Sequence, residues 1–175
     1  MSRQCSTRGT ASSTSEQVAE ARWPVTDGVV TLRAAEPADI PALLAGRDPE
    51  WERWLGPGDD EPRPAACIVV GGEIVGWVDF DTDRDWLKTG EVNVGYNVFT
   101  PYRLRGSARR AVLLLAAWLA DNTLVDRAYL AVDAENGASL GVADSVGAAV
   151  VGRYLNAQGR PQVHHVLRVR RSATP

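Results

Sequence analysis

The chain has 175 residues, of which 45% are hydrophobic and 23% charged, and it carries a net charge of −3 with a pI near 5.4. This is the composition of a soluble globular protein, and the length suits one domain with a single core. The acidic balance argues against a nucleic-acid-binding protein, which needs a basic face, and leaves room for a cationic or amine substrate.

The start of the chain differs in composition from the rest. Residues 1–22 are rich in Ser and Thr and nearly free of large apolar side chains, so we expect a flexible tail followed by one domain over 23–175. The longest apolar run is too short to cross a bilayer, and no signal-peptide pattern is present. Cys5 and Cys67 do not suggest a disulfide framework, and zinc-ligand spacing is absent. We therefore expect a cytoplasmic protein with no metal site and no membrane contact.

From Trp23 onward, strand and helix patterns follow one another with turn signals between them. The expected elements are a strand at 29–33, helices at 38–46 and near 51–55, strands at 66–70 and 74–81, a strand at 91–99, a helix through 111–119, a strand at 127–132, a helix at 137–146, and strands at 148–155 and 163–169. This order predicts an α/β (α+β) fold in which a mixed sheet carries helices on its faces.

Aromatic and acidic side chains in the first half leave two interpretations open. Trp51 and Trp54 share one helix face, where they either pack into the core or line a substrate pocket. Trp77 and Asp79 share one face of their strand. The four aspartates between residues 79 and 85 form either a rim that attracts cations or ordinary solvated turn chemistry.

The centre of the chain combines a strand, a basic glycine turn and a helix. The strand ends at 100–101, and the turn contains Arg103, Arg105 and Gly106. A helix N-terminus presents unpaired N–H groups and the positive end of the helix dipole, which favour an anion. Gly106 lets the backbone approach that anion closely, and Ser107 is expected to cap the helix. The pattern predicts a site that holds phosphates, although Gly-Lys-Ser/Thr and the Rossmann fingerprint are both missing.

Three stretches occur in order and in the right context: residues 90–98 on the strand, 103–108 at the helix start, and 132–140 after the next strand. Together they resemble the GCN5-related N-acetyltransferase (GNAT) family, most of all the branch that includes the ribosomal-protein alanine acetyltransferases. In that family such stretches form the splayed fourth strand, the acyl-CoA loop and the Asn-x-x-Ser segment that meets the pantetheine arm. The resemblance covers about residues 27–170.

The resemblance implies an acyl-CoA N-acyltransferase fold: a mostly antiparallel sheet splayed between its fourth and fifth strands, with about four flanking helices. It implies acetyl-CoA as co-substrate and no metal. The implied coenzyme A contacts are Val98, Phe99, Thr100, Arg103, Leu104, Arg105, Gly106, Ser107, Ala108, Arg109 and Asn136. The arginines at 103, 105 and 109 would add charge near the 3′-phosphate and the diphosphate.

Direct attack by an amine on acetyl-CoA needs a neutral amine, often a base, and an acid for the leaving thiolate. Many relatives carry a glutamate where this chain has Asn93, which cannot act as a base. Glu91 shares the strand face of Asn93 and is one substitute. Asp79 or Asp81, on the neighbouring strand, is another.

The acid for the thiolate is equally open. Many relatives have a tyrosine where this chain has Ala143, whereas the ribosomal-protein branch can use a serine at the position of Ser139. The candidate catalytic set is therefore Glu91, Asn93 and Ser139.

The expected reaction is acetyl transfer to a primary amine, on either a small molecule or a protein N-terminus. Candidate acceptor-binding residues are Trp51, Trp54, Trp77 and Asp79. A non-catalytic acyl-CoA-binding or sensor module is the alternative, because Asn93 and Ala143 replace two functional groups. Relatives often form homodimers, and a homodimer would be compatible with either function.

Overall fold

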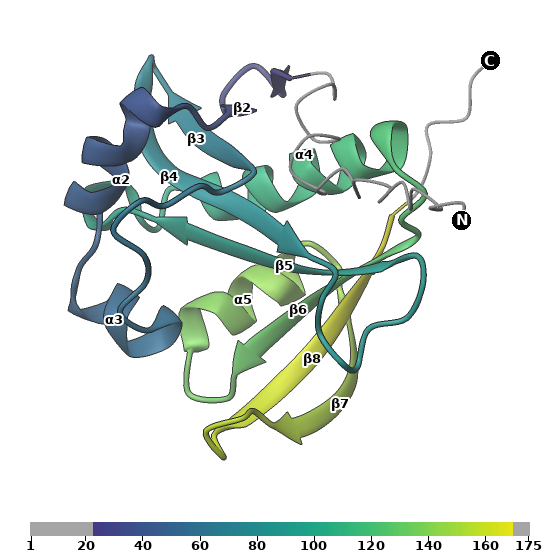
Figure 1. The fold of residues 1–175 in the computed structure, drawn as a ribbon. Helices are drawn as coiled ribbons and strands as arrows, with labels where there is room; N and C mark the ends of the chain where they lie inside the picture. The colour runs from purple at the N-terminus through teal and green to yellow at the C-terminus, as the bar shows by residue number, and fades with distance from the viewer. Residues whose placement is uncertain (1–22, 170–175) are drawn as a thin grey trace, which may run out of the picture.

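The computed structural model describes residues 23–169, which form an eight-stranded sheet flanked by helices (Figure 1). The strands lie in the order β1-β2-β3-β4-β5-β6-β8-β7. They are β1 (Val25–Thr26), β2 (Thr31–Ala34), β3 (Ala66–Val70), β4 (Glu73–Asp81), β5 (Glu91–Val98), β6 (Arg127–Asp133), β7 (Ala149–Leu155) and β8 (Pro161–Arg168). The helices are α2 (Ile40–Ala45), α3 (Pro49–Leu55), α4 (Ser107–Asn122) and α5 (Gly137–Ser145), with 3-10 turns at Pro37–Asp39 and Thr100–Tyr102.

Strands β5 and β6 form the parallel pair of this sheet, and their pairing is short. It joins Glu91–Asn93 to Arg127–Tyr129. Strand β5 nevertheless pairs with β4 as far as Val98, and β6 pairs with β8 over its whole length. The two strands therefore part after Asn93, and an opening in the sheet lies beside the second half of β5.

Helix α4 covers one face of the sheet. Val92, Val94 and Val98 alternate along β5 and share a core with Leu115 and Trp118 of α4, because side chains two apart on a strand point to the same face. Burying a large apolar side chain stabilises a fold by about 1.5–3 kcal/mol. This cluster therefore fixes α4, and with it the turn that precedes α4, against β5.

The other face of β4 and the end of β5 carry α2. Leu43 of α2 packs with Cys67 of β3 and with Phe99, which follows β5, while Trp77 lies beside them. Gly46 is the C-cap of α2, and a Cβ added there would lie 2.2 Å from the Phe99 ring. Only glycine allows so close an approach, so the end of α2 is held directly against the end of β5.

The expected α/β architecture and its splayed sheet are confirmed, with one shift in numbering. The short β1 was not expected, because two residues carry no periodic signal, and the splayed strands are therefore β5 and β6. The register between β4 and β5 is continuous, so the opening forms without a bulge in β5. The expected tail at 1–22 lies outside the described residues. Within 23–169, no helix combines the length and apolarity that a membrane crossing requires.

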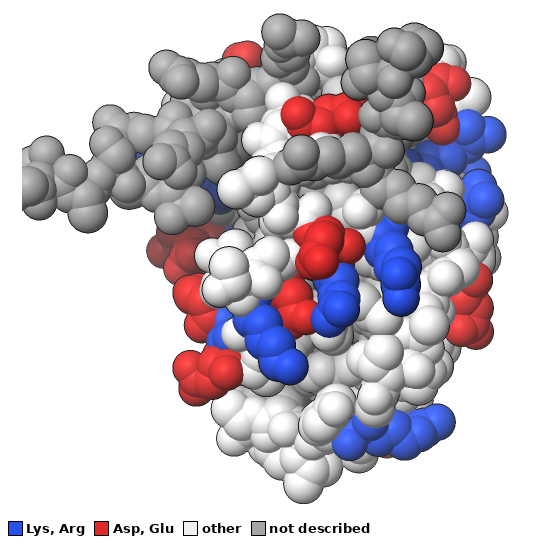
Figure 2. All heavy atoms as spheres, turned by 90° about the vertical axis from the view of Figure 1, so that its right-hand side faces the viewer, with Lys and Arg blue, Asp and Glu red and all other residues white. Residues whose placement is uncertain are grey.

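Charges of both signs are mixed on the surface. On the face seen in Figure 2, Lys and Arg side chains lie among Asp and Glu side chains, as far as the described residues show. A nucleic acid is bound through a basic patch or stripe that contacts successive phosphates. The interleaved charges of this face do not provide one.

Candidate active site

The turn before α4 presents a row of backbone donors. Within the described part of the chain, the N–H groups of residues 104–109 donate to no acceptor, and the Gly106 carbonyl accepts from Arg110 N–H at 3.2 Å. Gly106 has φ 80° and Leu104 has φ 61°, both in the left-handed region. That conformation costs a non-glycine residue about 1–2 kcal/mol, and it is typical of turns that gather successive N–H groups around an anion.

Ser107 does not cap the helix, so that expectation is wrong. The N-cap is Gly106, and no side chain there accepts a hydrogen bond from the first turn. Ser107 is itself the first helical residue and is buried. A side-chain cap would have satisfied one of the N–H groups at the start of α4. Without one, all of these donors remain for a ligand.

The three arginines in the turn and the first turn of α4 have different partners. Arg103 forms ion pairs with Asp48 at 2.8 Å and with Glu50 at 2.6 Å. Its charge is thus met by α3, and these contacts oppose the expectation that its side chain faces the phosphates. Arg105 and Arg109 form no ion pair within residues 23–169. Their charges are the ones available to phosphate.

Asp48 connects the turn before α4 to α3. One carboxylate oxygen accepts from Trp51 N–H at 2.7 Å and so caps α3, while the other accepts from Thr100 and Arg103. Burial raises the pKa of Asp48, but the hydrogen bonds from Thr100 and Trp51 and the Arg103 charge outweigh it and hold the pKa below its usual value. Thr100 is therefore engaged by α3 through its side chain.

The end of β5 offers fewer backbone groups to the pantetheine arm than expected. The Phe99 N–H donates to the Val75 carbonyl at 2.8 Å, so the expectation for that group is wrong. In an antiparallel pair, one residue directs both its N–H and its C=O toward the partner strand, and the next residue directs both away from it. Phe99 is bonded toward β4, so the N–H and C=O groups of Val98 and Tyr96 face the opening. The Val98 carbonyl accepts from Arg103 at 2.8 Å. Tyr96, which the sequence did not single out as a contact, lines the opening with Val98.

Asn136 and Ser139 lie at the start of α5. Asn136 is the N-cap, and its side-chain oxygen accepts from Ser139 N–H at 3.1 Å. The Tyr96 hydroxyl donates to the Ser139 carbonyl at 3.4 Å, and burial raises the pKa of Tyr96. The Ser139 hydroxyl has no hydrogen-bond partner in the described region, which leaves it to donate to a sulfur. Ala143 is fully buried, so its position contributes packing alone.

Glu91 is bound by three hydrogen-bond donors, which argues against the catalytic role expected for it. It is 5% exposed and accepts from Lys88 N–H at 3.0 Å, Arg127 at 3.0 Å and the Tyr129 hydroxyl at 3.3 Å. Burial raises the pKa of Glu91, but these hydrogen bonds outweigh it and hold the pKa below its usual value. A carboxylate stabilised in this way is a weak base. Glu91 fastens β5 to β6 before the two strands part.

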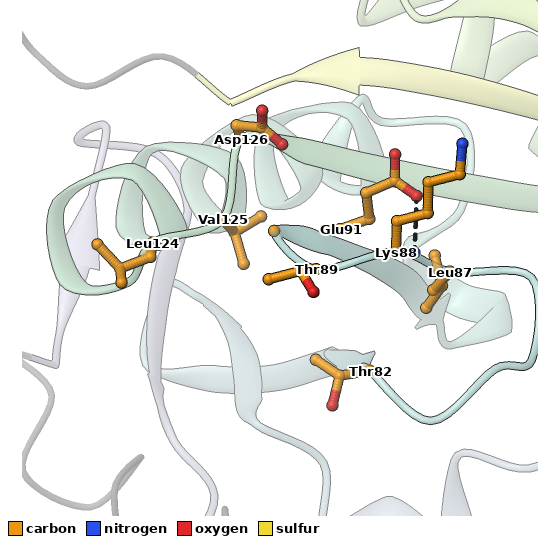
Figure 3. A pocket seen from close by; sticks show the side chains of 9 residues that line it. Thr82, Leu87, Lys88, Thr89, Glu91, Leu124, Val125 and Asp126 are labelled. Atoms are coloured by element: carbon orange, nitrogen blue, oxygen red, sulfur yellow. Dashed lines mark hydrogen bonds between the residues drawn. The ribbon is translucent and has the colours of Figure 1, made fainter.

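A cavity of about 580 Å³ lies beside Glu91 (Figure 3). Its walls come from the segment between β4 and β5 and from the segment after α4: Thr82, Leu87, Lys88, Thr89, Gly90, Glu91, Leu124, Val125 and Asp126. The cavity is at the N-terminal end of β5, whereas the turn before α4 follows the C-terminal end. The cavity is therefore separate from the turn before α4.

Asn93 and Asp81 are joined by a hydrogen bond. The Asn93 amide donates to Asp81 at 3.1 Å, and Arg84 donates to both oxygens of the same carboxylate at 3.0 Å. The charge of Asp81 is thus met by an arginine. The Asn93 amide oxygen is buried without a hydrogen-bond partner among the described atoms. Neither residue offers a proton acceptor of useful basicity.

Asp79 has a different environment. It accepts from Ala65 N–H at 3.1 Å, and no ion pair in the described region involves it. Burial raises the pKa of Asp79, and the nearby Asp81 raises it further. Its register partner on β5 is Gly95, so Asp79 lies one strand away from the opening.

The two tryptophans of α3 have separate roles. Trp51 is 7% exposed, with the Arg47 guanidinium 4.5 Å from its ring, so it serves the core. Trp54 lies near two guanidinium groups, Arg53 at 4.4 Å and Arg160 at 5.3 Å from its ring. Such cation–π contacts contribute about 0.5–1 kcal/mol each at exposed sites. Trp54 thereby joins α3 to the turn between β7 and β8.

An aromatic group gathers on the face of β5 that carries Asn93, and sequence reasoning missed it. The Trp86 ring lies 4.5 Å from His164 and 5.3 Å from Tyr129, and Tyr154 lies 4.6 Å from His164. Tyr129 is the register partner of Asn93. Burial lowers the pKa of His164, as does the adjacent histidine, which favours a neutral ring. No local motif could reveal this group, because strand pairing alone brings its members together.

A splayed sheet with free donors at a helix N-terminus beside the opening defines a class of protein that binds a phosphate-bearing carrier along a strand edge. Residues 59–149 match the family model described as acetyltransferase (GNAT) domain. The match covers more than half of the chain, which therefore belongs to the GNAT family of acetyltransferases. This confirms the resemblance seen in the sequence. The chain therefore carries an acetyltransferase domain of this family.

Solved structures share the fold at low sequence identity. A GNAT acetyltransferase from Bacillus anthracis is 14% identical with a TM-score of 0.72, covering 83% of this chain and 98% of that one. The ribosomal L7/L12 alpha-N-protein acetyltransferase RimL in complex with coenzyme A is 18% identical with a TM-score of 0.69, covering 83% and 97%. The aminoglycoside acetyltransferase AAC(6')-Ib in complex with coenzyme A is 17% identical with a TM-score of 0.69, covering 79% and 94%. No curated protein sequence matches the chain.

Proposed function

We propose that this chain transfers an acetyl group from acetyl-CoA to a primary amine by direct attack of the amine on the thioester. The observation that carries this proposal is the row of N–H groups at residues 104–109, which have no acceptor within the described chain and follow the open edge of β5. Donors at a helix N-terminus fit a diphosphate, and an open strand edge fits the amides of a pantetheine arm.

The residues present fit coenzyme A. The N–H groups of 104–108 and the α4 dipole would hold the diphosphate, with Arg105 and Arg109 supplying charge. The N–H and C=O groups of Tyr96 and the Val98 N–H would pair with the pantetheine amides. Acetyl-CoA supplies an activated acetyl group, and the chain supplies orientation and a path for protons.

Direct attack is favoured over an acetylated enzyme by the state of Cys67. This thiol is fully buried in the core beneath α2, and it donates to Asp39 at 3.5 Å. Burial raises the pKa of Cys67 to about 12. Since the thiolate is the nucleophilic form, Cys67 is not a nucleophile at neutral pH.

The proposed acceptor is a small-molecule amine or a protein N-terminus. The names of two structural neighbours include these two classes: RimL as a ribosomal L7/L12 alpha-N-protein acetyltransferase and AAC(6')-Ib as an aminoglycoside acetyltransferase. Asp79, which lacks an ion-pair partner among residues 23–169, supports an amine that arrives as a cation. The proposal includes that the chain belongs to the ribosomal-protein branch of the family.

The proposal is tested by thiol release from acetyl-CoA across a panel of polyamines, aminoglycosides and peptides with free N-termini. We expect release with at least one amine, together with micromolar or tighter binding of acetyl-CoA in calorimetry. The second candidate, a non-catalytic acyl-CoA sensor, is favoured by Asn93 and Ala143. It predicts the same binding with no thiol release from any amine in the panel.

Two further expectations accompany the proposal. A homodimer is tested by light scattering coupled to size-exclusion chromatography, where a mass near 18.9 kDa would indicate a monomer instead. A cytoplasmic location is tested by fractionation of the native host. Neither expectation enters the argument for acetyl transfer.

A further inference from the structure

Strand β5 offers no basic side chain next to its opening. Glu91, Asn93 and Asn97 are its polar side chains on the face away from α4. Glu91 is bound by three donors, and the two asparagines carry amides, which do not accept protons at neutral pH. An acceptor amine that attacks a thioester must nevertheless lose a proton. The group that receives it has to come from another strand.

Strand β4 brings two carboxylates to that face. Asp81 is the register partner of Asn93, and Asp79 is the register partner of Gly95. Asn93 ends the pairing of β5 with β6, so Gly95 lies beside the opening. Gly95 has no side chain to stand between Asp79 and the opening, and an added Cβ there would meet only the Trp77 ring, at 3.8 Å. Neighbouring strands are about 4.8 Å apart, which places Asp79 one strand spacing behind Gly95, a separation from the opening that water can bridge.

The two carboxylates differ in charge environment. Asp81 is held by both nitrogens of the Arg84 fork and by Asn93. Asp79 meets backbone N–H groups, from Ala65 and from Phe80, and the charged group that faces it is Asp81. Burial without a cation raises the pKa of Asp79, as a proton acceptor requires.

We propose that Asp79 is the general base of this site, which deepens the function proposed above and rests on it. The lone pair of the neutral amine nitrogen forms the C–N bond to the acetyl carbonyl carbon. The C–S bond breaks, and its electron pair leaves with the coenzyme A thiolate. The proton from nitrogen passes to the Asp79 carboxylate and then to solvent, and the thiolate takes up a proton from solvent, directly or relayed through the Ser139 hydroxyl, which is reprotonated by solvent.

The test compares the wild type with Asp79→Asn, which keeps the shape and an acceptor for Ala65 N–H. We expect kcat to fall about 100-fold, because a general base contributes roughly 10²–10⁴ in rate. Calorimetric affinity for acetyl-CoA should stay within about twofold of wild type. The wild-type kcat/KM should fall at acid pH with an apparent pKa equal to that of Asp79 measured by carboxyl NMR in the cofactor-free protein. This acid limb should be missing in the variant.

Three further variants make the test decisive. Asp83→Asn changes an exposed carboxylate after β4 and should leave kcat unchanged. His164→Gln removes the neutral imidazole on β8, which is the rival base; loss of the acid limb in this variant and not in Asp79→Asn overturns the proposal. Asp79→Glu keeps a carboxylate, so even if Asp79→Asn folds poorly, an acid limb retained in Asp79→Glu supports the proposal and its absence contradicts it.

Failure of this inference is distinguishable from failure of the proposed function. A wild type that acetylates an amine, with Asp79→Asn equally fast, overturns the role of Asp79 and leaves acetyl transfer standing. A wild type that binds acetyl-CoA but acetylates no amine overturns both.

Discussion

The two ends of β5 are built for different tasks. At the N-terminal end, the Glu91 carboxylate is met by Arg127 and Tyr129 and joins β5 to β6. At the C-terminal end, the backbone of Tyr96 and Val98 faces the opening left by β6. The N-terminal end uses the Glu91 carboxylate in internal contacts, whereas the C-terminal end leaves the backbone of Tyr96 and the Val98 N–H unpaired within the described chain. The role of a carboxylate near this turn in sequence therefore depends on its hydrogen-bond and charge partners and not on its position along the chain.

The largest expected effect on stability comes from a change at the N-terminal end of β5, where Glu91 joins β5 to β6. Glu91→Gln keeps the side-chain shape but removes the charge that Arg127 and Tyr129 meet. Hydrogen bonds to a charged group contribute about 1.5–3 kcal/mol, so we expect the free energy of unfolding in urea to fall by about 2 kcal/mol. Acetyl-CoA affinity should not change. Glu73→Gln is the control, because Glu73 is exposed and accepts one hydrogen bond, from Tyr102; unchanged stability with lost turnover in Glu91→Gln would restore Glu91 as a catalytic residue.

The next effect is expected beyond the C-terminal end of β5, in the turn before α4. Gly106→Asp places a negative charge at the N-terminus of α4, where a phosphate is expected to bind. We expect acetyl-CoA affinity in calorimetry to fall about tenfold or more, which corresponds to about 1.4 kcal/mol. Gly106→Asn is the matched control, since asparagine tolerates the φ of 80° and adds no charge. Equal affinity in the Asp and Asn variants would contradict the phosphate site.

A smaller effect is expected from the strained residue of the same turn. Leu104 is fully exposed at φ 61°. Leu104→Gly removes a backbone cost of about 1–2 kcal/mol and adds a chain-entropy cost of about 0.5–1 kcal/mol. The net gain in unfolding free energy should be about 0.5–1 kcal/mol by chemical denaturation. Leu124, 85% exposed but without a positive φ, is the control, and Leu124→Gly should lower stability; a loss in both variants would show that the turn is unstrained.

The smallest effect is a pH dependence that separates the two ends. The folded-state pKa of Glu91 lies below its usual value, so its stabilising contribution is present above about pH 4.3, the usual pKa of a glutamate, and is lost as the pH falls through the folded value. The stability difference between wild type and Glu91→Gln should be constant from pH 7 to pH 5 and narrow below that. Asp79, whose pKa is raised, has the opposite sign. A difference that persists unchanged at pH 3 would contradict the charge-based role of Glu91.

The sequence predicted the family and most of the fold because both rest on local patterns. Alternation of apolar and polar residues indicates the strands. The motif of Arg103, Gly106 and Ala108 lies within six consecutive residues. The sequence could not assign the carboxylates, because their partners are distant along the chain: Arg127 lies 36 residues after Glu91. The ion pairs of Arg103 with α3 were hidden for the same reason. His164 and Trp86 carried no motif at all.

The strand, the basic turn and the helix with free N-terminal donors could be predicted from the sequence alone, because glycine conformation and helix-terminal donors are properties of adjacent residues. Only the tertiary structure decided which carboxylate can act as a base. Pairing of β5 with β6 gives Glu91 an arginine, and Arg84 holds Asp81. Pairing of β4 with β5 buries Asp79 opposite Gly95 with no cation in contact among the described residues. Basicity depends on desolvation and on neighbouring charge, and both arise only when distant segments pack together.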